Sequence, residues 1–233
     1  MSISRFSRLA LLSGALVIAS VLPPRAQIAP SAAEIAGYRG LHAAAAAGDL
    51  AAIERLSAGG ADLNARDAHG RTPLHVAAHA RRHAAAKLLL ANGADANAFE
   101  RQRYDIVTIA AAANDVEMLK LALAGGASAK NVTSPYDGTA LIAAAHLGHF
   151  EVVKTLIAAK APLDHVNNLG WTALIEAVIL GDGGRNHIET VKALVAAGAR
   201  LDLGDRQGMT PLALANSRGY HEIAAVLTRA GAP

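Results

Sequence analysis

The residues with the clearest potential for chemistry are three histidines spaced four apart, His75, His79 and His83. Residues i and i+4 are neighbours on a helix surface, so one helix through all three would align their imidazoles. Neutral imidazole is a common zinc ligand, and such a row invites a metal hypothesis. No carboxylate or further histidine follows at a spacing that would complete the site. The interpretation therefore depends on the elements that carry these side chains.

The chain from residue 39 onward repeats itself. Six segments align, and they begin at Arg39, Arg71, Asp105, Thr139, Trp171 and Met209. Equivalent apolar residues are separated by 33, 33, 34, 33 and 38 positions, at Leu41, Leu74, Val107, Leu141, Leu174 and Leu212. A fixed period of this length indicates stacked supersecondary units, each of which buries its apolar face against the next copy.

Each copy is expected to contain two short helices. In the second copy, Thr72 can cap the first helix and Pro73 fits its first turn, where a missing N–H costs little. The second helix is expected to end at Gly93, in a left-handed conformation. Lys160 holds this place in the fourth copy, where we expect a strained or shifted ending at a cost of about 1 kcal/mol. Glycine holds it in the other copies, at Gly60, Gly126, Gly198 and Gly231.

The recurring order of Thr-Pro-Leu-His, Gly-His, an apolar helix and Gly-Ala-Asp resembles the ankyrin repeat. The resemblance covers residues 39–233, with repeats near 39–70, 71–104, 105–138, 139–170, 171–208 and 209–233. It implies an all-α solenoid of helix-turn-helix units with β-turn or hairpin fingers. It also implies that His75, like His42, bonds loop backbone. A turn then separates the two helices, so His83 belongs to the second helix and the three histidines form no single row.

Other candidate sites follow the period of the scaffold. Aspartate and asparagine recur in the turns and are interpreted as turn caps rather than as calcium ligands or paired catalytic carboxylates. They are Asp62, Asn64, Asp67, Asp95, Asn97, Asp202 and Asp205. No nucleophile elbow, P-loop or His-Glu-x-x-His motif is present. We predict a protein that is not an enzyme and has no cofactor or metal; a metal or enzymatic role of the second repeat's histidines is the competing hypothesis.

The amino-terminal residues have the layout of an export signal. Arg5 and Arg8 precede an apolar run at 9–22, which is short for a membrane span. We assign 1–26 to a signal peptide and 27–38 to a linker or short helix, with cleavage after Ala26 or Ala33. The expected location is periplasmic or secreted; an uncleaved inner-membrane anchor is the alternative, and only then is membrane contact expected. The absence of cysteine excludes disulfides and a lipid-modified cysteine.

The charge of the chain does not favour nucleic acid. Residues 1–26 contain three of the 22 lysines and arginines and none of the 19 acidic side chains, so the remainder is formally neutral. Phosphate binding needs a basic face, and stacking of bases needs aromatic side chains, which make up only 3% of the sequence. We therefore predict a protein partner and no nucleic acid.

Binding is expected at the fingers and at the exposed side of the first helices, because side chains there do not pack against neighbouring repeats. We expect Arg71, Arg101 and Arg103 to form a basic spot that meets carboxylates, and Trp171, the only tryptophan, to be a hot spot. In the competing interpretation, Trp171 packs over its own turn and the arginines are solvated. By the ankyrin resemblance, the binding groove comprises Arg71, His79, Arg101, Arg103, Tyr104, Tyr136, His146, Leu147, Leu169, Trp171, Ile179, Leu180, Arg206 and Met209.

The fifth copy is five residues longer than the usual repeat. The extra residues, Asp182 to Asn186, are expected to lengthen the turn between its helices, to protrude away from the fingers and to offer a second contact surface.

These observations predict a monomeric, non-enzymatic scaffold for protein–protein interaction, exported to the periplasm. Its resemblance to exported bacterial ankyrin proteins implies support of a periplasmic enzyme or of peroxide defence. The alternative is an immunity or inhibitor protein that masks the active site of a toxin or enzyme.

Overall fold

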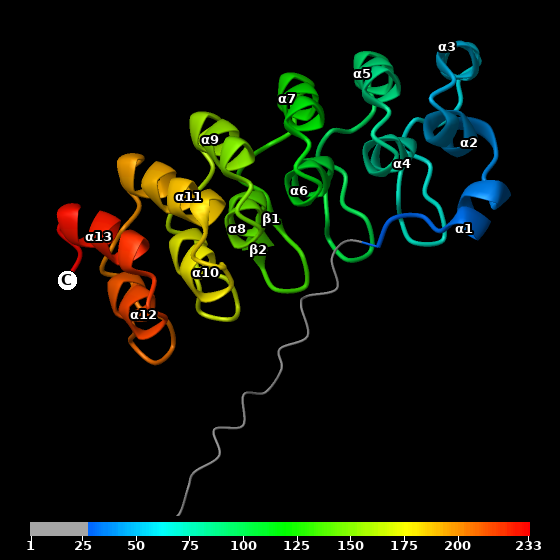
Figure 1. The fold of residues 1–233 in the computed structure, drawn as a ribbon. Coiled ribbons are helices and arrows are strands. Elements are labelled where there is room, and N and C mark those ends of the chain that lie inside the picture. The colour runs from blue at the N-terminus through cyan, green and yellow to red at the C-terminus, as the bar shows by residue number, and fades with distance from the viewer. Residues whose placement is uncertain (1–27) are drawn as a thin grey trace, which may run out of the picture.

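A computed structural model describes residues 28–233 of the chain, and the expected export signal at 1–26 lies outside this part. A short helix, α1 (Ala32–Gly37), precedes six helix pairs (Figure 1). The first helices of the pairs are α2 (Gly40–Ala47), α4 (Pro73–His79), α6 (Ile106–Ala112), α8 (Ala140–His146), α10 (Ala173–Ile179) and α12 (Pro211–Ser217). The second helices are α3 (Leu50–Ala58), α5 (His83–Ala91), α7 (Val116–Ala124), α9 (Phe150–Ala158), α11 (Arg185–Ala196) and α13 (His221–Arg229).

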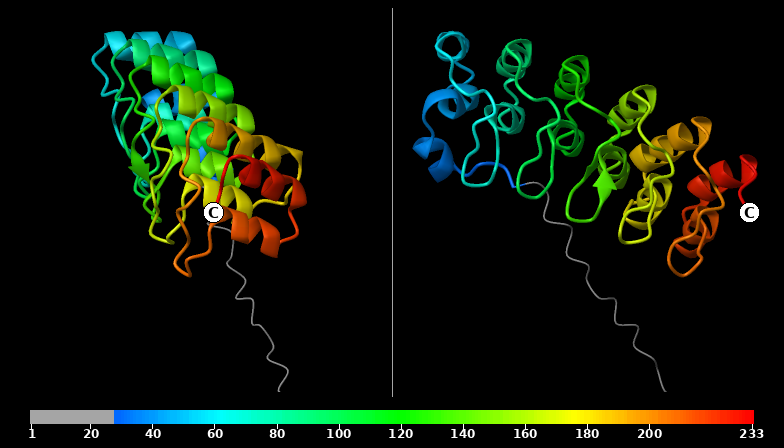
Figure 2. Two further views of the ribbon diagram at one scale, coloured as in Figure 1. Left: turned by 90° about the vertical axis from the view of Figure 1, so that its left-hand side faces the viewer. Right: turned by 180° about the vertical axis from the view of Figure 1, so that it is seen from behind.

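The pairs stack into two layers of helices. Each first helix contacts the first helix of the next pair, and the second helices do the same. Figure 2 shows the fingers projecting from one edge of this stack. Alanines such as Ala45, Ala77, Ala111, Ala144 and Ala177 are fully buried between neighbouring first helices, so these helices approach closely. The predicted all-α solenoid is confirmed.

Local signals set the ends of the helices. The Thr72 hydroxyl accepts a hydrogen bond from the His75 N–H, and the His75 imidazole caps the Thr72 N–H in return. Thr139, Thr172 and Thr210 cap the equivalent first helices. At the end of the second helices, all the predicted glycines have positive φ, from 76° at Gly60 to 97° at Gly93, and Lys160 has φ 62°. The prediction of a strained ending at Lys160 is confirmed, because this lysine adopts the conformation that glycine adopts elsewhere.

The fingers are the turns that precede the first helices of the second to sixth repeats, near residues 68–71, 101–104, 135–136, 168–171 and 206–209. Hydrogen bonds from their own side chains and from neighbouring fingers hold them in place. Asp67 accepts hydrogen bonds from the backbone N–H groups of His69 and Arg71, at 2.8 and 2.9 Å. Equivalent Asp205 does the same for Gln207 and Met209. In the third finger, β1 (Val132–Thr133) pairs antiparallel with β2 (Gly138–Thr139). The turn-cap prediction is confirmed at Asp67 and Asp205. It is also confirmed at Asp62 and Asp95, which accept from the N–H groups two residues later, and at Asn64 and Asn97, which accept from N–H groups of the next repeat. It is wrong at Asp202, which pairs with Arg200 at 2.7 Å.

The insertion of the fifth repeat is shared between a turn and a helix. The turn before α11 has two residues more than the turn between α8 and α9, and α11 has twelve residues where α9 has nine. The Asp182 carboxylate accepts from the Gly184 N–H and lies 2.8 Å from Nδ1 of His187, which is in the first turn of the longer helix α11. Tyr220 of the last repeat donates to the Gly181 carbonyl at 2.8 Å. The prediction that all five residues lengthen a protruding turn is therefore wrong, because neighbouring side chains hold the segment against the stack.

Candidate protein-binding surface

The three histidines occupy two helices and serve the scaffold. His79 ends α4 and His83 begins α5, so the prediction that they form no single row is confirmed. The His75 ring is buried, with Nδ1 2.8 Å from the Thr72 hydroxyl and Nε2 3.3 Å from the Tyr104 carbonyl. Burial lowers the pKa of His75 and of half-buried His79 to about 4, so both are neutral at pH 7. Within residues 28–233, no group of three histidines and carboxylates is arranged to hold a metal ion.

Arg71 is not available to a partner, contrary to the sequence prediction. Its side chain is only 2% exposed. The guanidinium donates Nε–H to Asp67 Oδ2 at 2.7 Å and Nη1–H to the Ile28 carbonyl at 3.2 Å, and Nη2 pairs with Glu34. The physical reason is the short segment 28–38, which packs over the first finger and covers the arginine.

The cluster around Arg71 stabilises ionised carboxylates. Hydrogen bonds from Ser31 and then Arg71 lower the pKa of Glu34 to about 2. Burial acts to raise the pKa of Asp67, but hydrogen bonds from Tyr38 and Arg71 outweigh it and hold the value at about 2. The Tyr38 hydroxyl donates to Asp67 at 2.7 Å. Segment 28–38 therefore closes the amino-terminal end of the stack through ion pairs and hydrogen bonds.

Within residues 28–233, the predicted basic spot is reduced to one guanidinium without an ion-pair partner, that of Arg101. Arg103, with φ 64°, lies 3.0 Å from the Asp137 carboxylate, and both side chains are exposed. Tyr104 is 7% exposed because its ring packs into the core, so its prediction as a contact residue is wrong. Arg101 is exposed, and no carboxylate of residues 28–233 lies within 4.0 Å of it. Arg206 is exposed on the fifth finger and donates to the Asn168 carbonyl.

Apolar side chains gather on the first helices and fingers of the last three repeats. Leu147 follows α8 and is 43% exposed, and Met209 on the last finger is 36% exposed. Ile179 and Leu180 occupy the end of α10 at the positions equivalent to His146 and Leu147, and they are half-buried. We call the set Leu147, Leu169, Trp171, Ile179, Leu180 and Met209 the carboxyl-terminal apolar face. Tyr136, 37% exposed, lies on the preceding finger.

Trp171 connects the finger of its repeat to the core. The backbone N–H of Trp171 donates to Asn167 Oδ1 at 3.0 Å, and the backbone carbonyl of Trp171 accepts from the backbone N–H of Asn167 at 3.0 Å. The side chain is half-buried and packs against the hydrophobic core. Trp171 thus has both a packing role and an exposed edge.

Glu176, which is not among the residues predicted from the sequence, lies between these side chains and is 5% exposed. Its Oε1 accepts from Asn167 Nδ2 at 2.8 Å, and its Oε2 lies 3.2 Å from His146 Nδ1. His146, a predicted contact residue, is half-buried at the end of α8. The repeat alignment could have singled out Glu176, because the equivalent residues of the other repeats are all apolar: Ala43, Val76, Ile109, Ala143 and Leu214.

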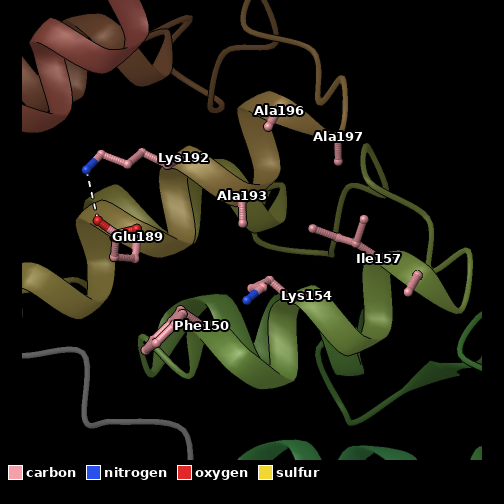
Figure 3. A pocket seen from close by; sticks show the side chains of 9 residues that line it. Phe150, Lys154, Ile157, Glu189, Lys192, Ala193, Ala196 and Ala197 are labelled. Carbon is pink, nitrogen blue, oxygen red and sulfur yellow. Dashed lines mark hydrogen bonds and ion pairs between the residues drawn. The ribbon is translucent and has the colours of Figure 1, made fainter.

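A separate hollow of about 600 Å³ lies between the second helices α9 and α11 (Figure 3). Ile157 and small alanines form much of its lining. Its two lysines are neutralised by neighbours, since Lys154 lies 3.3 Å from Glu151 and Lys192 lies 2.8 Å from Glu189. The hollow therefore presents no uncompensated charge.

Comparisons with known proteins agree with this architecture. The family model for three copies of the ankyrin repeat matches residues 14–100 and 107–183, and the single-repeat model matches 169–206. The chain belongs to the ankyrin repeat family. Among residues 28–233, no helix has the length and apolar character needed to cross a membrane.

Several relatives are themselves ankyrin proteins. YahD of Escherichia coli strain K12 is 35% identical over 103 residues, which are 44% of this chain, so the match spans about half (51%) of YahD. An ankyrin repeat domain from Acinetobacter baumannii AYE is 45% identical with a TM-score of 0.80, over 83% of this chain and 98% of that one.

A more distant neighbour comes from a complex. The structure of the predatory endopeptidase Bd0816 from Bdellovibrio bacteriovorus with the immunity protein Bd3460 contains a chain 25% identical to this one. The TM-score is 0.69, and the match covers 82% of this chain and 98% of that one. Ankyrin repeats indicate a scaffold for protein–protein interaction, and the family is generally non-catalytic.

Proposed function

We propose that this protein is a non-enzymatic, exported scaffold that binds one protein partner through the carboxyl-terminal apolar face and the neighbouring fingers. The observation that carries the proposal is the exposure of Leu147 and Met209 on either side of half-buried Trp171, Ile179 and Leu180. Interface cores are enriched in aromatic residues and methionine, and truncation of a central tryptophan commonly removes much of the affinity. Arg101 of the second finger, which forms no ion pair with any of residues 28–233, adds a cation at the edge of this surface.

The proposed compartment is the periplasm, where the chain would act as a monomer. The support is the order of Arg5, Arg8 and the apolar run at 9–22. Supporting a periplasmic enzyme, including one of peroxide defence, is the role we propose for the complex.

Affinity capture tests the proposal. The full chain, tagged at its carboxyl end, is expressed in its source organism, and the mass of the recovered chain and the proteins retained from the periplasmic fraction are determined. We expect a processed chain and one enriched partner, and Trp171→Ala combined with Arg101→Ala should weaken capture at least about tenfold. Lys120→Ala, on the exposed side of α7, is the matched control.

The circular dichroism and melting temperature of each variant separate binding from folding. A double variant that loses helicity in proportion to capture would show that these residues are structural. Recovery of the unprocessed chain in the cytosol would refute the proposed export, whereas a captured partner unaffected by the double variant would refute the proposed surface.

The second candidate is an immunity or inhibitor protein, favoured by the likeness to a chain in the endopeptidase–immunity protein complex. In that case the partner is an enzyme whose active site the apolar face covers. Adding the chain at one equivalent should then abolish the turnover of the captured enzyme, and turnover that is unchanged at saturating chain would reject this role.

A further inference from the structure

The inner position of the fifth repeat carries a charge where the other repeats carry none. Glu176 occupies the place held elsewhere by alanine, valine, isoleucine or leucine, and only 5% of it is exposed. An isolated carboxylate at such a place is costly, because a buried charge needs a charged or hydrogen-bonding partner. The contacts of Glu176 therefore determine which charge and which hydrogen-bonding groups this part of the surface presents to a second protein.

The partners of Glu176 within the chain are one uncharged amide and one imidazole. The amide of Asn167 donates at 2.8 Å but carries no charge. His146 lies with Nδ1 3.2 Å from the carboxylate. When the imidazole is neutral, its Nδ1–H donates to Glu176 and its Nε2 is left as an acceptor. The pair then carries one net negative charge and offers a hydrogen-bond acceptor on the half-buried histidine.

The surroundings of this pair favour a long cationic side chain. Leu147, next to His146, is 43% exposed, and Ile179 and Leu180 are half-buried at the end of α10. Lysine and arginine place apolar stems along such side chains while the charged head reaches a polar group. Two other carboxylates of these repeats already have partners: Asp182 pairs with His187, and Asp137 pairs with Arg103.

We infer that the carboxyl-terminal apolar face recognises an arginine or lysine of the partner flanked by apolar residues, with the cation donating to His146 Nε2 beside Glu176. This inference rests on the proposed function, since it names the chemistry of the segment bound at the same face. Trp171, two residues before α10, supplies an aromatic edge for the flanking apolar residues.

Selection from a library of displayed 12-residue peptides tests the inference, with the full chain immobilised through a carboxyl-terminal tag. We expect enrichment of arginine or lysine between apolar residues. The affinity of an enriched peptide is then measured by the fluorescence of Trp171, which reports this site alone because it is the only tryptophan. Glu176→Gln should weaken binding at least about tenfold. It retains an acceptor for Asn167, so the finger stays attached to α10.

Glu151→Gln is the matched control, since Glu151 is an exposed carboxylate on the second helix α9, and it should leave the affinity unchanged. Enrichment of acidic peptides, or equal binding to wild type and Glu176→Gln, would overturn the inference. If peptides without a cation bind wild type and Glu176→Gln equally, and calorimetry shows that they do not bind Trp171→Ala, the proposed binding face stands and the cation recognition fails. If no peptide is enriched, neither the proposed binding face nor the cation recognition applies to a linear segment of a partner.

Discussion

Replacing Arg71 by methionine should release the amino-terminal end of the stack. Methionine retains most of the apolar stem but removes the guanidinium that joins segment 28–38 to the first finger, while His69 stays 3.0 Å from Glu34. The change leaves Glu34 and Asp67 ionised, close together and without their shared partner. Breaking a buried ion pair by removing one partner is strongly destabilising, because the remaining charge keeps its desolvation cost.

The pKa values set the size of the effect. The pKa of Asp67 falls from an ordinary 3.8 to about 2, and one pKa unit corresponds to about 1.4 kcal/mol, so its contacts contribute at most about 2.5 kcal/mol. The side chain of Glu34 is 30% exposed, so water screens its pair and we assign it at most about 1 kcal/mol. Tyr38 and the backbone N–H groups retain part of the Asp67 contribution, so we expect Arg71→Met to cost about 2 kcal/mol of local opening free energy.

Hydrogen exchange measured by mass spectrometry locates this loss. In a repeat protein each unit contacts only its neighbours, so destabilisation at one end stays near that end. Amides of residues 28–70 should exchange about 30-fold faster, since about 1.4 kcal/mol corresponds to a factor of ten. Amides of α11 and α13 should be unchanged. Acceleration below about fivefold in 28–70, or equal acceleration throughout, would refute the assignment of Arg71 as the residue that holds segment 28–38.

Three further predictions follow from backbone geometry and burial. Lys160→Gly should raise the free energy of unfolding by about 0.5–1 kcal/mol, because it removes left-handed strain at φ 62°; a lower urea midpoint would contradict this. Gly181→Ala should lower the free energy of unfolding by about 2 kcal/mol and the melting temperature by several degrees, because the added Cβ would lie 2.1 Å from the Ala177 carbonyl oxygen. Gly37→Ala is the control, because a Cβ at Gly37 would meet open space. His75 has a pKa of about 4, below the ordinary 6.5, so the unfolded chain binds more protons and stability should fall by at most about 3 kcal/mol as pH drops from 6.5 to 4. His75→Gln should flatten that dependence of the urea midpoint, and an unchanged slope would refute the burial argument.

The sequence by itself determined the repeating architecture. Helix starts at Thr72 and its equivalents, and helix ends at glycine or Lys160, are local features, because a cap or a left-handed residue needs only its chain neighbours. The same alignment separated His79 from His83 and so removed the apparent row of histidines. Six repeats in phase then reinforced each local signal.

Only the tertiary structure decided which predicted contact residues are free. Arg71 is covered by Glu34, 37 positions earlier in the chain, and Arg103 is paired with Asp137, 34 positions later. The meaning of the Glu176 carboxylate for binding depends on its contact with His146, which belongs to the preceding repeat. Exposure and pairing depend on which distant segments pack together, and a repeat period specifies the stack but not these individual side-chain contacts. The insertion likewise joined a helix rather than a free turn because His187 and Tyr220 hold it from outside the inserted turn.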